Sequence, residues 1–442
     1  MTTPICDFAR RYAERDALRL HMPGHKGAGF LGVEQWDITE IDGADSLYEA
    51  AGIIRESEDN ASALFGVPTF YSTEGSSQCI RAMLYLVALH AKKQGKRPLI
   101  LAGRNAHKTF LNAVALLDVA VKWLLPKEGE SYLSCKVSAE DVAAQLSAMA
   151  EKPTAVYLTS PDYLGNVADI AAIAAVCHRY GVLLVVDNAH GAYLKFLQPS
   201  RHPMDLGADM CCDSAHKTFP VLTGGAYLHA VEEFAPQCKN ALQLFGSTSP
   251  SYLIMESLDG ANAYLADGYS EKLAAFAEKV QALKERLAAL GYPLQGDEPM
   301  KVTVAAKGYG YTGEELAAML LEKNIVCEFA DRDFVVLMLT PEIGEDGLQR
   351  LEGVLRAVEK KAVMEELPPV FHACTPVMSV REAMLSPSET VTVEESVGRV
   401  LAAASVGCPP AVPIVVCGER IDSEAAACFA YYGIKTCAVV AQ

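Results

Sequence analysis

The chain has 442 residues, of which 51% are hydrophobic and 21% charged, so it can form a globular protein with a large core and two or three domains. Its 38 lysines and arginines against 55 aspartates and glutamates give a formal net charge of −17, which disfavours nucleic acid or an anionic membrane as a partner and would suit a cationic substrate. The 13 cysteines are odd in number and show no C-x-x-C spacing, and no apolar signal segment opens the chain, so we expect reduced thiols in the cytoplasm.

The first 60 residues are rich in glycine, proline and aspartate and predict an irregular amino-terminal arm. Within the arm, His21 and His25 stand four positions apart, but Pro23 and Gly24 separate them, so they do not share a helical face. Because cysteine ligands are also missing nearby, we expect no metal site there.

From about residue 64 to residue 229, helical patterns alternate with short apolar runs, which predicts a mostly parallel sheet covered by helices on both faces. The predicted strands lie at 98–102, 119–125, 155–159, 182–186, 209–212 and 225–228. The longest apolar runs, such as 170–177, fall short of the roughly 20 residues that a membrane helix needs. No membrane span is therefore expected.

A candidate phosphate site precedes the helical run over 78–93. Gly75, Ser76 and Ser77 place backbone N–H groups and two hydroxyls where a helix begins, and this end of a helix binds anions. An ordinary serine cap without a ligand is the more common origin of such a sequence when it is taken alone.

Two chemically matched residues, Asp187 and Lys217, lie 30 positions apart, each just past a predicted strand. Loops at the carboxyl ends of parallel strands hold the ligands of open α/β sheets. Pyridoxal phosphate needs a lysine amine that can form a Schiff base and a carboxylate that keeps its pyridine nitrogen protonated. Either residue alone is commonly a solvated loop residue or a helix cap, but their order and spacing predict a pyridoxal phosphate site.

Further polar side chains could complete this site. Ser214 and His216 flank the lysine and could donate hydrogen bonds to the phosphate. His107 follows the strand that ends at residue 102 and could stack on the cofactor ring. His190 could orient the carboxylate or touch the ring or the substrate. A structural hydrogen bond in a loop is the alternative for each histidine.

A small separate domain is predicted over 301–361, where the pattern is β-α-β-β-α. Gly308 to Gly313 matches G-x-G-x-x-G between a strand and a helix, and Glu328 follows as it would in a dinucleotide site. The domain is too short for a full dinucleotide fold and two tyrosines crowd the turn, so nucleotide binding is a minor alternative. A proline-rich joint at 367–369 leads to a final segment with its own helical and apolar runs.

The chain resembles the Orn/Lys/Arg decarboxylase family, the fold-type-I pyridoxal phosphate enzymes that act on basic amino acids, and the likeness covers nearly all of it. The segments that carry the resemblance are Leu20–Lys26, Asp37–Glu40, Asp45–Leu47, Asp187–Gly191, Ser214–Thr218, Ser247–Tyr252, Pro409–Pro413 and Gly418–Glu419. The chain departs from the family pattern at Cys408, Ala411, Cys417 and Asp162, where an aromatic residue, glycine, proline and threonine are usual. These departures leave the cofactor residues intact and bear on substrate specificity.

The resemblance implies an α/β protein in the shorter form of the family, which lacks an amino-terminal receiver-like wing. It consists of an arm (1–60), a fold-type-I pyridoxal phosphate-binding large domain with a mostly parallel sheet (61–260), a small α/β domain with α+β character (261–366) and a C-terminal α+β decarboxylase domain (367–442). Active sites in that family lie between two subunits, so a homodimer or a larger homo-oligomer is expected. The segment that contains Thr248 is similar to the one that reaches the cofactor phosphate of the partner subunit.

The activity that the resemblance implies is decarboxylation of a basic L-amino acid in the cytoplasm. Arginine, giving agmatine for polyamine biosynthesis, is the leading substrate, with lysine and ornithine open. The expected catalytic residues are Lys217, His107, Asp187 and His216, of which Lys217 or His216 returns the proton to Cα.

The distal cation of such a substrate needs a carboxylate at the far end of the pocket. Glu419 is the first candidate and Asp45 the second, although a structural ion pair would explain either residue equally well. Another fold-type-I activity, an aminotransferase or a Cα–Cβ lyase, would use the same lysine and aspartate. A catalytically silent homologue that regulates an active partner is a third possibility.

Overall fold

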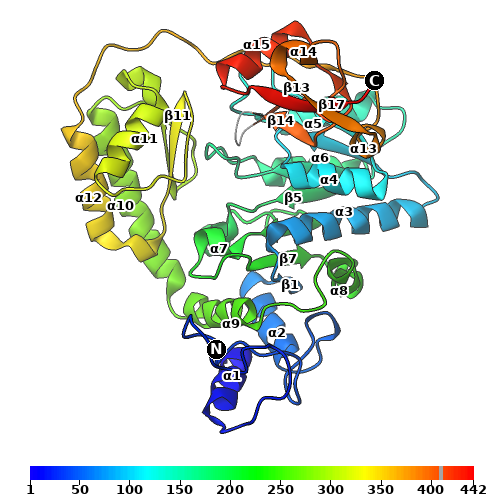
Figure 1. Ribbon diagram of the computed structural model, residues 1–442, viewed down its shortest axis with the longest axis vertical. Helices are drawn as coiled ribbons and strands as arrows, with labels where there is room; N and C mark the ends of the chain where they lie inside the picture. Colours follow the sequence, from blue (N-terminus) through cyan, green and yellow to red (C-terminus); the bar gives the residue numbers. More distant parts are fainter. Residues whose placement is uncertain (408–411) are drawn as a thin grey trace. The chain divides into compact units, whose positions relative to one another are not determined.

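The computed structural model describes residues 1–407 and 412–442, so Cys408 and the Pro409–Ala411 part of the family-like segment lie outside the described residues. Helices and strands of the chain are labelled in Figure 1. The chain divides into two compact units. The first unit contains residues 1–94 and 183–273, and the second contains 95–182 and 274–442. A large seven-stranded sheet has four strands in the first unit, in the order β1-β7-β6-β5, and three in the second, in the order β4-β2-β3.

The four strands of the first unit are β1 (Thr69–Ser72), β5 (Leu183–Asp187), β6 (Met210–Asp213) and β7 (Ala226–Ala230). β5 and β6 are parallel, with Asp187 opposite Cys212, whereas β7 runs antiparallel to both β6 and β1. The predictions of β5, β6 and β7 are confirmed to within two residues, as is usual for element ends. Because β5 and β6 are parallel, the residues that follow them emerge at the same edge.

The helices of the first unit are α1 (Pro4–Glu14), α2 (Ile53–Phe65), α3 (Gly75–Lys93), α7 (Ala215–Thr218), α8 (Ala235–Gln243) and α9 (Tyr252–Ala266), with the short 3-10 helices η1 (Leu47–Glu49) and η2 (Ala192–Phe196). The expectation of an irregular arm is wrong for its first part, since α1 forms there. Pro4 occupies the first helical position, and Ile5 and Ala9, one turn apart, are fully buried.

A single carboxylate anchors the start of α1. Asp259 of α9 accepts hydrogen bonds from the backbone N–H groups of Ile5 and Cys6, each at 3.0 Å. Its other oxygen accepts a bond of 2.6 Å from the Ser57 hydroxyl of α2. The first N–H groups of a helix lack partners within the helix, and an anion there also interacts favourably with the helix dipole. Asp259 is fully buried and thereby joins α1, α2 and α9.

In the second unit, β2 (Leu99–Gly103) pairs in parallel with β3 (Ala120–Leu124) and with β4 (Ala155–Thr159), as the apolar runs predict. The accompanying helices are α4 (Lys108–Leu117), α5 (Ala139–Ala148) and α6 (Ile170–Arg179). Together with the parallel pair of the first unit, these strands make the large sheet mostly parallel, which confirms the α/β class.

A second sheet in this unit has the antiparallel order β10-β11-β9-β8, formed by Phe329–Ala330, Phe334–Met338, Lys301–Ala305 and Leu294–Gln295. Its helices are α10 (Tyr269–Ala289), which begins in the first unit, α11 (Gly313–Glu322) and α12 (Gly344–Ala357), with the 3-10 turns η3 (Ala306–Tyr309) and η4 (Pro341–Ile343). The predicted β-α-β-β-α order is therefore confirmed.

The glycine-rich turn of this small sheet is filled by the protein itself. The Tyr309 ring stacks on Tyr292 with 3.8 Å between ring centroids, and the Tyr311 hydroxyl donates to the Glu359 carbonyl at 2.8 Å. A Cβ atom on Gly313 would stand 2.2 Å from a backbone oxygen of the neighbouring strand. These glycines therefore permit close packing, and the geometry gives no support to a nucleotide at this turn.

The carboxy-terminal part contains three two-stranded antiparallel sheets, β12-β16, β13-β17 and β14-β15. Its elements are β12 (Thr375–Pro376), α13 (Val380–Leu385), β13 (Ser388–Thr392), α14 (Val393–Ser396), β14 (Ser405–Gly407), β15 (Pro413–Val416), β16 (Glu419–Arg420), α15 (Ser423–Tyr431) and β17 (Thr436–Val440). A core that includes Leu401, Ile414 and Phe429 also takes in Tyr132, and α13 packs against α4. None of the helices in the described parts of the chain has the length and apolar character to cross a membrane.

Candidate active site

Lys217 lies in the single-turn helix α7, directly after β6. Its Nζ atom is 3.0 Å from Nε2 of His190, a buried residue in the loop that follows β5. The structure thus brings together the amine expected to react and a histidine that the sequence placed in the same site. The contact defines His190 as a partner of the lysine, a role that the sequence did not distinguish from contact with the ring or the carboxylate.

Asp187 ends β5 with 2% of its surface exposed. Its Oδ1 atom accepts the Ala189 N–H at 3.2 Å and lies 3.7 Å from the Cys212 thiol. A carboxylate held in this way can keep the pyridine nitrogen of pyridoxal phosphate protonated. Sequence reasoning missed Cys212, although its place opposite Asp187 follows once the register of β5 and β6 is known.

The start of α3 is suited to hold a phosphate. Gly75 has a φ of +71°, which favours glycine, and the N-cap residue Glu74 makes no capping hydrogen bond with its side chain. The Ser214 hydroxyl donates to the Ser76 hydroxyl at 2.8 Å, so two hydroxyls from different loops meet at this helix end. Hydroxyls beside a helix amino terminus match the needs of a phosphate dianion. The residues present therefore fit the cofactor at its amine, pyridine and phosphate contacts.

His216 is half-buried next to Lys217, and its ring proton is fixed. Nδ1 lies 2.9 Å from the Gly225 carbonyl oxygen, which can only accept, so Nδ1 carries the proton. Burial lowers the pKa of His216, and the charge of Lys217 lowers it further, against the opposite effect of the bond to Gly225. The neutral ring then leaves Nε2 as an acceptor.

His107 follows β2 in the second unit and caps α4. Its Nδ1 atom accepts the backbone N–H of Thr109 at 3.2 Å, and the residue is exposed. Thr248, in the first unit, is also exposed. The stacking role of His107 and the phosphate contact of Thr248 stay predictions.

Asp45 acts as a cap for α2. Its two oxygens accept backbone N–H groups at distances from 2.7 to 3.4 Å, from Ser46, Ala51, Gly52, Ile54 and Arg55. Burial alone would raise the pKa of Asp45, but the N–H donors of Ala51 and Gly52 and their neighbours outweigh it, so the pKa lies below its usual range. This carboxylate is committed to the backbone.

Glu419 forms a buried bidentate ion pair with Arg104, which follows β2. The two N–H···O distances are 2.7 and 2.8 Å, and the side chains are 5% and 1% exposed. Glu419 also accepts the Val416 N–H at 2.9 Å, and the guanidinium lies 5.3 Å from the Trp123 ring centroid. Glu419 therefore joins the carboxy-terminal part to the segment after β2, in the same unit. Its carboxylate is already paired.

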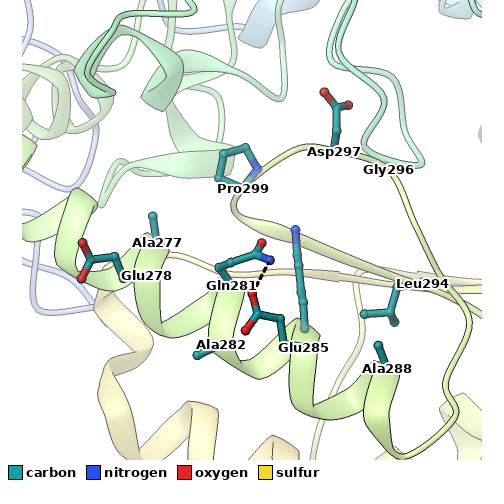
Figure 2. A pocket seen from close by; sticks show the side chains of 11 residues that line it. Ala277, Glu278, Gln281, Ala282, Glu285, Ala288, Leu294, Gly296, Asp297 and Pro299 are labelled. Atoms are coloured by element: carbon teal, nitrogen blue, oxygen red, sulfur yellow. Dashed lines mark hydrogen bonds between the residues drawn. The ribbon is translucent and has the colours of Figure 1, made fainter.

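Two pockets lie in the second unit away from these contacts. Figure 2 shows an open pocket of about 710 Å³ between α10 and the loop before β9, where Gln281 donates to Glu285 at 3.0 Å. The predicted site residues do not line it.

A smaller pocket of about 300 Å³ at the carboxyl ends of β2 and β4 is lined in part by Asn105 and Asp162. Asp162, one of the departures from the family pattern, accepts the backbone and side-chain N–H groups of Asn166, each at 2.8 Å, and so braces its own turn.

Comparison with known proteins identifies the family of the chain. Residues 3–291 match the Orn/Lys/Arg decarboxylase major domain, and residues 358–437 match the C-terminal domain of the same family. The Bacillus subtilis (strain 168) protein YaaO is 30% identical over 96% of this chain and 93% of its own length, and the arginine decarboxylase of that organism is 27% identical over 96% and 92%. The solved structure of the Francisella novicida lysine decarboxylase LdcF is similar with a TM-score of 0.81, at 14% identity, over 99% of this chain and 81% of that one. The chain therefore belongs to the Orn/Lys/Arg decarboxylase family and is a pyridoxal phosphate-dependent amino acid decarboxylase.

Proposed function

We propose that the enzyme decarboxylates L-arginine to agmatine, a precursor for polyamine biosynthesis. The similarity to an arginine decarboxylase over nearly the full length of both chains carries this proposal. The lysine decarboxylase structure supports the fold alone, since its identity to this chain is 14%. The net charge of −17 also favours a cationic substrate.

Different residues of the first unit would bind different parts of the cofactor. Lys217 supplies the amine, and His190 at 3.0 Å orients it. Asp187 would hold the pyridine nitrogen, and the start of α3 with Ser76 and Ser214 would hold the phosphate. When bound, pyridoxal phosphate supplies an electron sink for the electron pair that carbon dioxide leaves behind on Cα.

The proton that Cα takes up is better supplied by Lys217 than by His216. The single proton of a neutral His216 is donated to the Gly225 carbonyl, and burial disfavours a second one. Lys217 has three protons when charged, and His190 Nε2 accepts one of them. We therefore assign the proton donor role to Lys217.

Neither of the two candidate carboxylates is well suited to the guanidinium of the substrate. Glu419 is paired with Arg104, and Asp45 is surrounded by backbone donors. We infer that another acid recognises the distal cation.

We also propose that the enzyme is a homodimer. Large apolar side chains of the arm, Leu18, Leu20, Phe30 and Leu31, are each more than 80% exposed. Several large apolar side chains exposed in one segment of a chain suggest a surface that a partner covers. Light scattering of the purified enzyme should give twice the mass of the chain, and a monomer at micromolar concentration would contradict this proposal.

The substrate is tested by supplying L-arginine, L-lysine and L-ornithine separately to the holoenzyme. Released carbon dioxide is measured and the amine product is identified by mass. Arginine should give the highest kcat/KM by at least about tenfold, a difference of about 1.4 kcal/mol in transition-state binding. Faster turnover of lysine or ornithine would overturn the arginine assignment. Lys217→Ala is the inactive control.

A further inference from the structure

Four metal-binding side chains converge in the interior of the first unit, beside the cofactor residues. His202 precedes β6, Cys211 and Asp213 belong to β6, and His229 belongs to β7. All four are fully buried, and one candidate ligand atom from each lies within 4.8 Å of the others. The Nε2 atoms of both histidines lie 3.1 Å from Asp213 Oδ2, and Cys211 Sγ lies 3.9 Å from His202 Nε2.

We propose that this cluster, the His202–His229 cluster, binds one zinc ion. Two imidazoles, one thiolate and one carboxylate form a ligand set that zinc accepts in closed tetrahedral sites. With zinc bonds of about 2.0–2.1 Å to nitrogen or oxygen and about 2.3 Å to sulfur, tetrahedral ligands stand roughly 3.3–3.6 Å apart. The observed separations of 3.1 and 3.9 Å lie on either side of this range, and all four ligand atoms lie within 4.8 Å of one another, so some of them must move closer together when zinc binds.

The hydrogen bonds of His229 are compatible with a metal ion at this place. The Thr69 hydroxyl lies 3.0 Å from the Val67 carbonyl oxygen and 2.9 Å from His229 Nδ1. When Thr69 gives its one proton to Val67, it accepts from His229, and the neutral ring then carries its proton on Nδ1. In that tautomer Nε2, 3.1 Å from the Asp213 carboxylate, is free of a proton and can bind a metal ion. When Thr69 donates to Nδ1 instead, Nε2 carries the proton and donates it to Asp213 without a metal ion.

A histidine that binds zinc through Nε2 normally donates its Nδ1 proton to an oxygen, and the Thr69 hydroxyl oxygen stands 2.9 Å from His229 Nδ1 for this purpose. The charges also balance, because a thiolate and a carboxylate neutralise Zn²⁺ and the two imidazoles are neutral. A neutral site can be buried at lower cost than an isolated charge. The rival arrangement without metal has both neutral imidazoles donating to Asp213 through Nε2, with the Thr69 hydroxyl donating to His229 Nδ1. It is consistent with the 3.4 Å contact from the Met204 N–H to His202 Nδ1, which zinc binding would have to displace.

The expected role of the ion is to hold the scaffold of the active site. The ion would hold β6 and β7 to the segment before β6. One of its ligands, Asp213, directly precedes Ser214, a residue of the candidate phosphate site. The Asn188 side chain donates to Asp213 at 2.6 Å, so the loop after Asp187 is attached to the same point. With four protein ligands there is no open position for a substrate, which indicates a structural site whose metal binds as the protein folds.

The test uses the holoenzyme, produced in zinc-supplemented medium and purified without a metal-affinity tag. Elemental analysis should find close to one zinc ion per chain. Zinc X-ray absorption should show one sulfur at about 2.3 Å and three nitrogen or oxygen neighbours at about 2.0–2.1 Å. Cys211→Ser and His202→Gln should each lose the zinc, whereas Cys238→Ser, at a buried cysteine of α8 outside the cluster, should retain it.

A zinc content far below one ion per chain in the wild type would overturn the proposal and favour the arrangement in which both imidazoles donate to Asp213. An absorption spectrum without a sulfur neighbour, or zinc retained in both ligand variants, would overturn it as well. The wild-type measurements decide the matter even if the two variants fail to fold. They are also independent of which amino acid the enzyme decarboxylates.

Discussion

Replacing Glu419 by glutamine should destabilise the second unit, because it removes one charge from a buried ion pair. Arg104 is 1% exposed, so its guanidinium cannot turn to water when its partner becomes neutral. Removing one member of a buried pair typically costs about 3–5 kcal/mol. The glutamine oxygen can keep one of the two bonds to Arg104, at 2.7 and 2.8 Å in the wild type, so we expect the lower end, about 3 kcal/mol.

Urea denaturation followed by tryptophan fluorescence measures this loss close to the pair. Trp123 lies beside Arg104, and the other tryptophan, Trp36, can be removed by Trp36→Phe in every variant. A lower midpoint with an unchanged slope would report a loss of stability alone. The double variant Arg104→Met with Glu419→Met should recover most of the loss, since apolar replacement of both partners of a buried pair is often neutral.

A stability within about 0.5 kcal/mol of the wild type, the range of ordinary surface substitutions, would refute this reasoning. A raised KM for arginine at unchanged stability would restore Glu419 as the carboxylate that recognises the substrate. The structure leads us to expect the opposite pattern, a large loss of stability with little change in KM.

Three further outcomes follow from the first unit. Lys217→Ala should abolish the Schiff-base absorbance band of the bound cofactor and lower kcat at least about 10³-fold; a normal spectrum and rate would exclude it as the reacting amine. Asp45→Ala should cost about 1–2 kcal/mol in urea denaturation through the lost cap of α2, with an unchanged KM, whereas a raised KM at full stability would point to a role in substrate binding. Burial, together with the carboxylates of Asp37 and Asp259, raises the pKa of Glu256 from 4.5 to about 8, so the folded state prefers its protonated form. Its contribution to stability should be complete below pH 4.5 and disappear as the pH rises through 8; Glu256→Gln should flatten this part of the stability–pH curve, and an unchanged curve would contradict the raised pKa.

The sequence predicts the parallel strands and the residues at their ends, because a buried parallel strand is a continuous apolar run with a visible end. Asp187 and Lys217 could be placed at one edge for this reason. β1 was missed because it has four residues and all are buried, so it shows no alternation. α1 was missed because the arm as a whole is rich in glycine and proline. This composition concealed the short amphipathic helix pattern of its first residues.

The partners of the two candidate substrate carboxylates could not be predicted. Arg104 and Glu419 are 315 positions apart, and no local pattern pairs them. The donors around Asp45 are backbone N–H groups, which every residue other than proline has, so the residue types in the sequence do not identify them. The His202–His229 cluster was missed for a related reason. Its ligands come from two strands and a loop with irregular spacing, and only the antiparallel register of β6 and β7 brings them together.

The attachment of α1 to Asp259 determines how the amino terminus can be handled in practice. Deleting the first six residues would remove two backbone donors from a carboxylate with 0% exposure, and each lost donor would cost about 1–3 kcal/mol. The deletion would also destabilise the packing of α2, because Ser57 of α2 donates to the same carboxylate. Truncations and cleavage sites at the amino end should therefore leave Ile5 and Cys6 in the product.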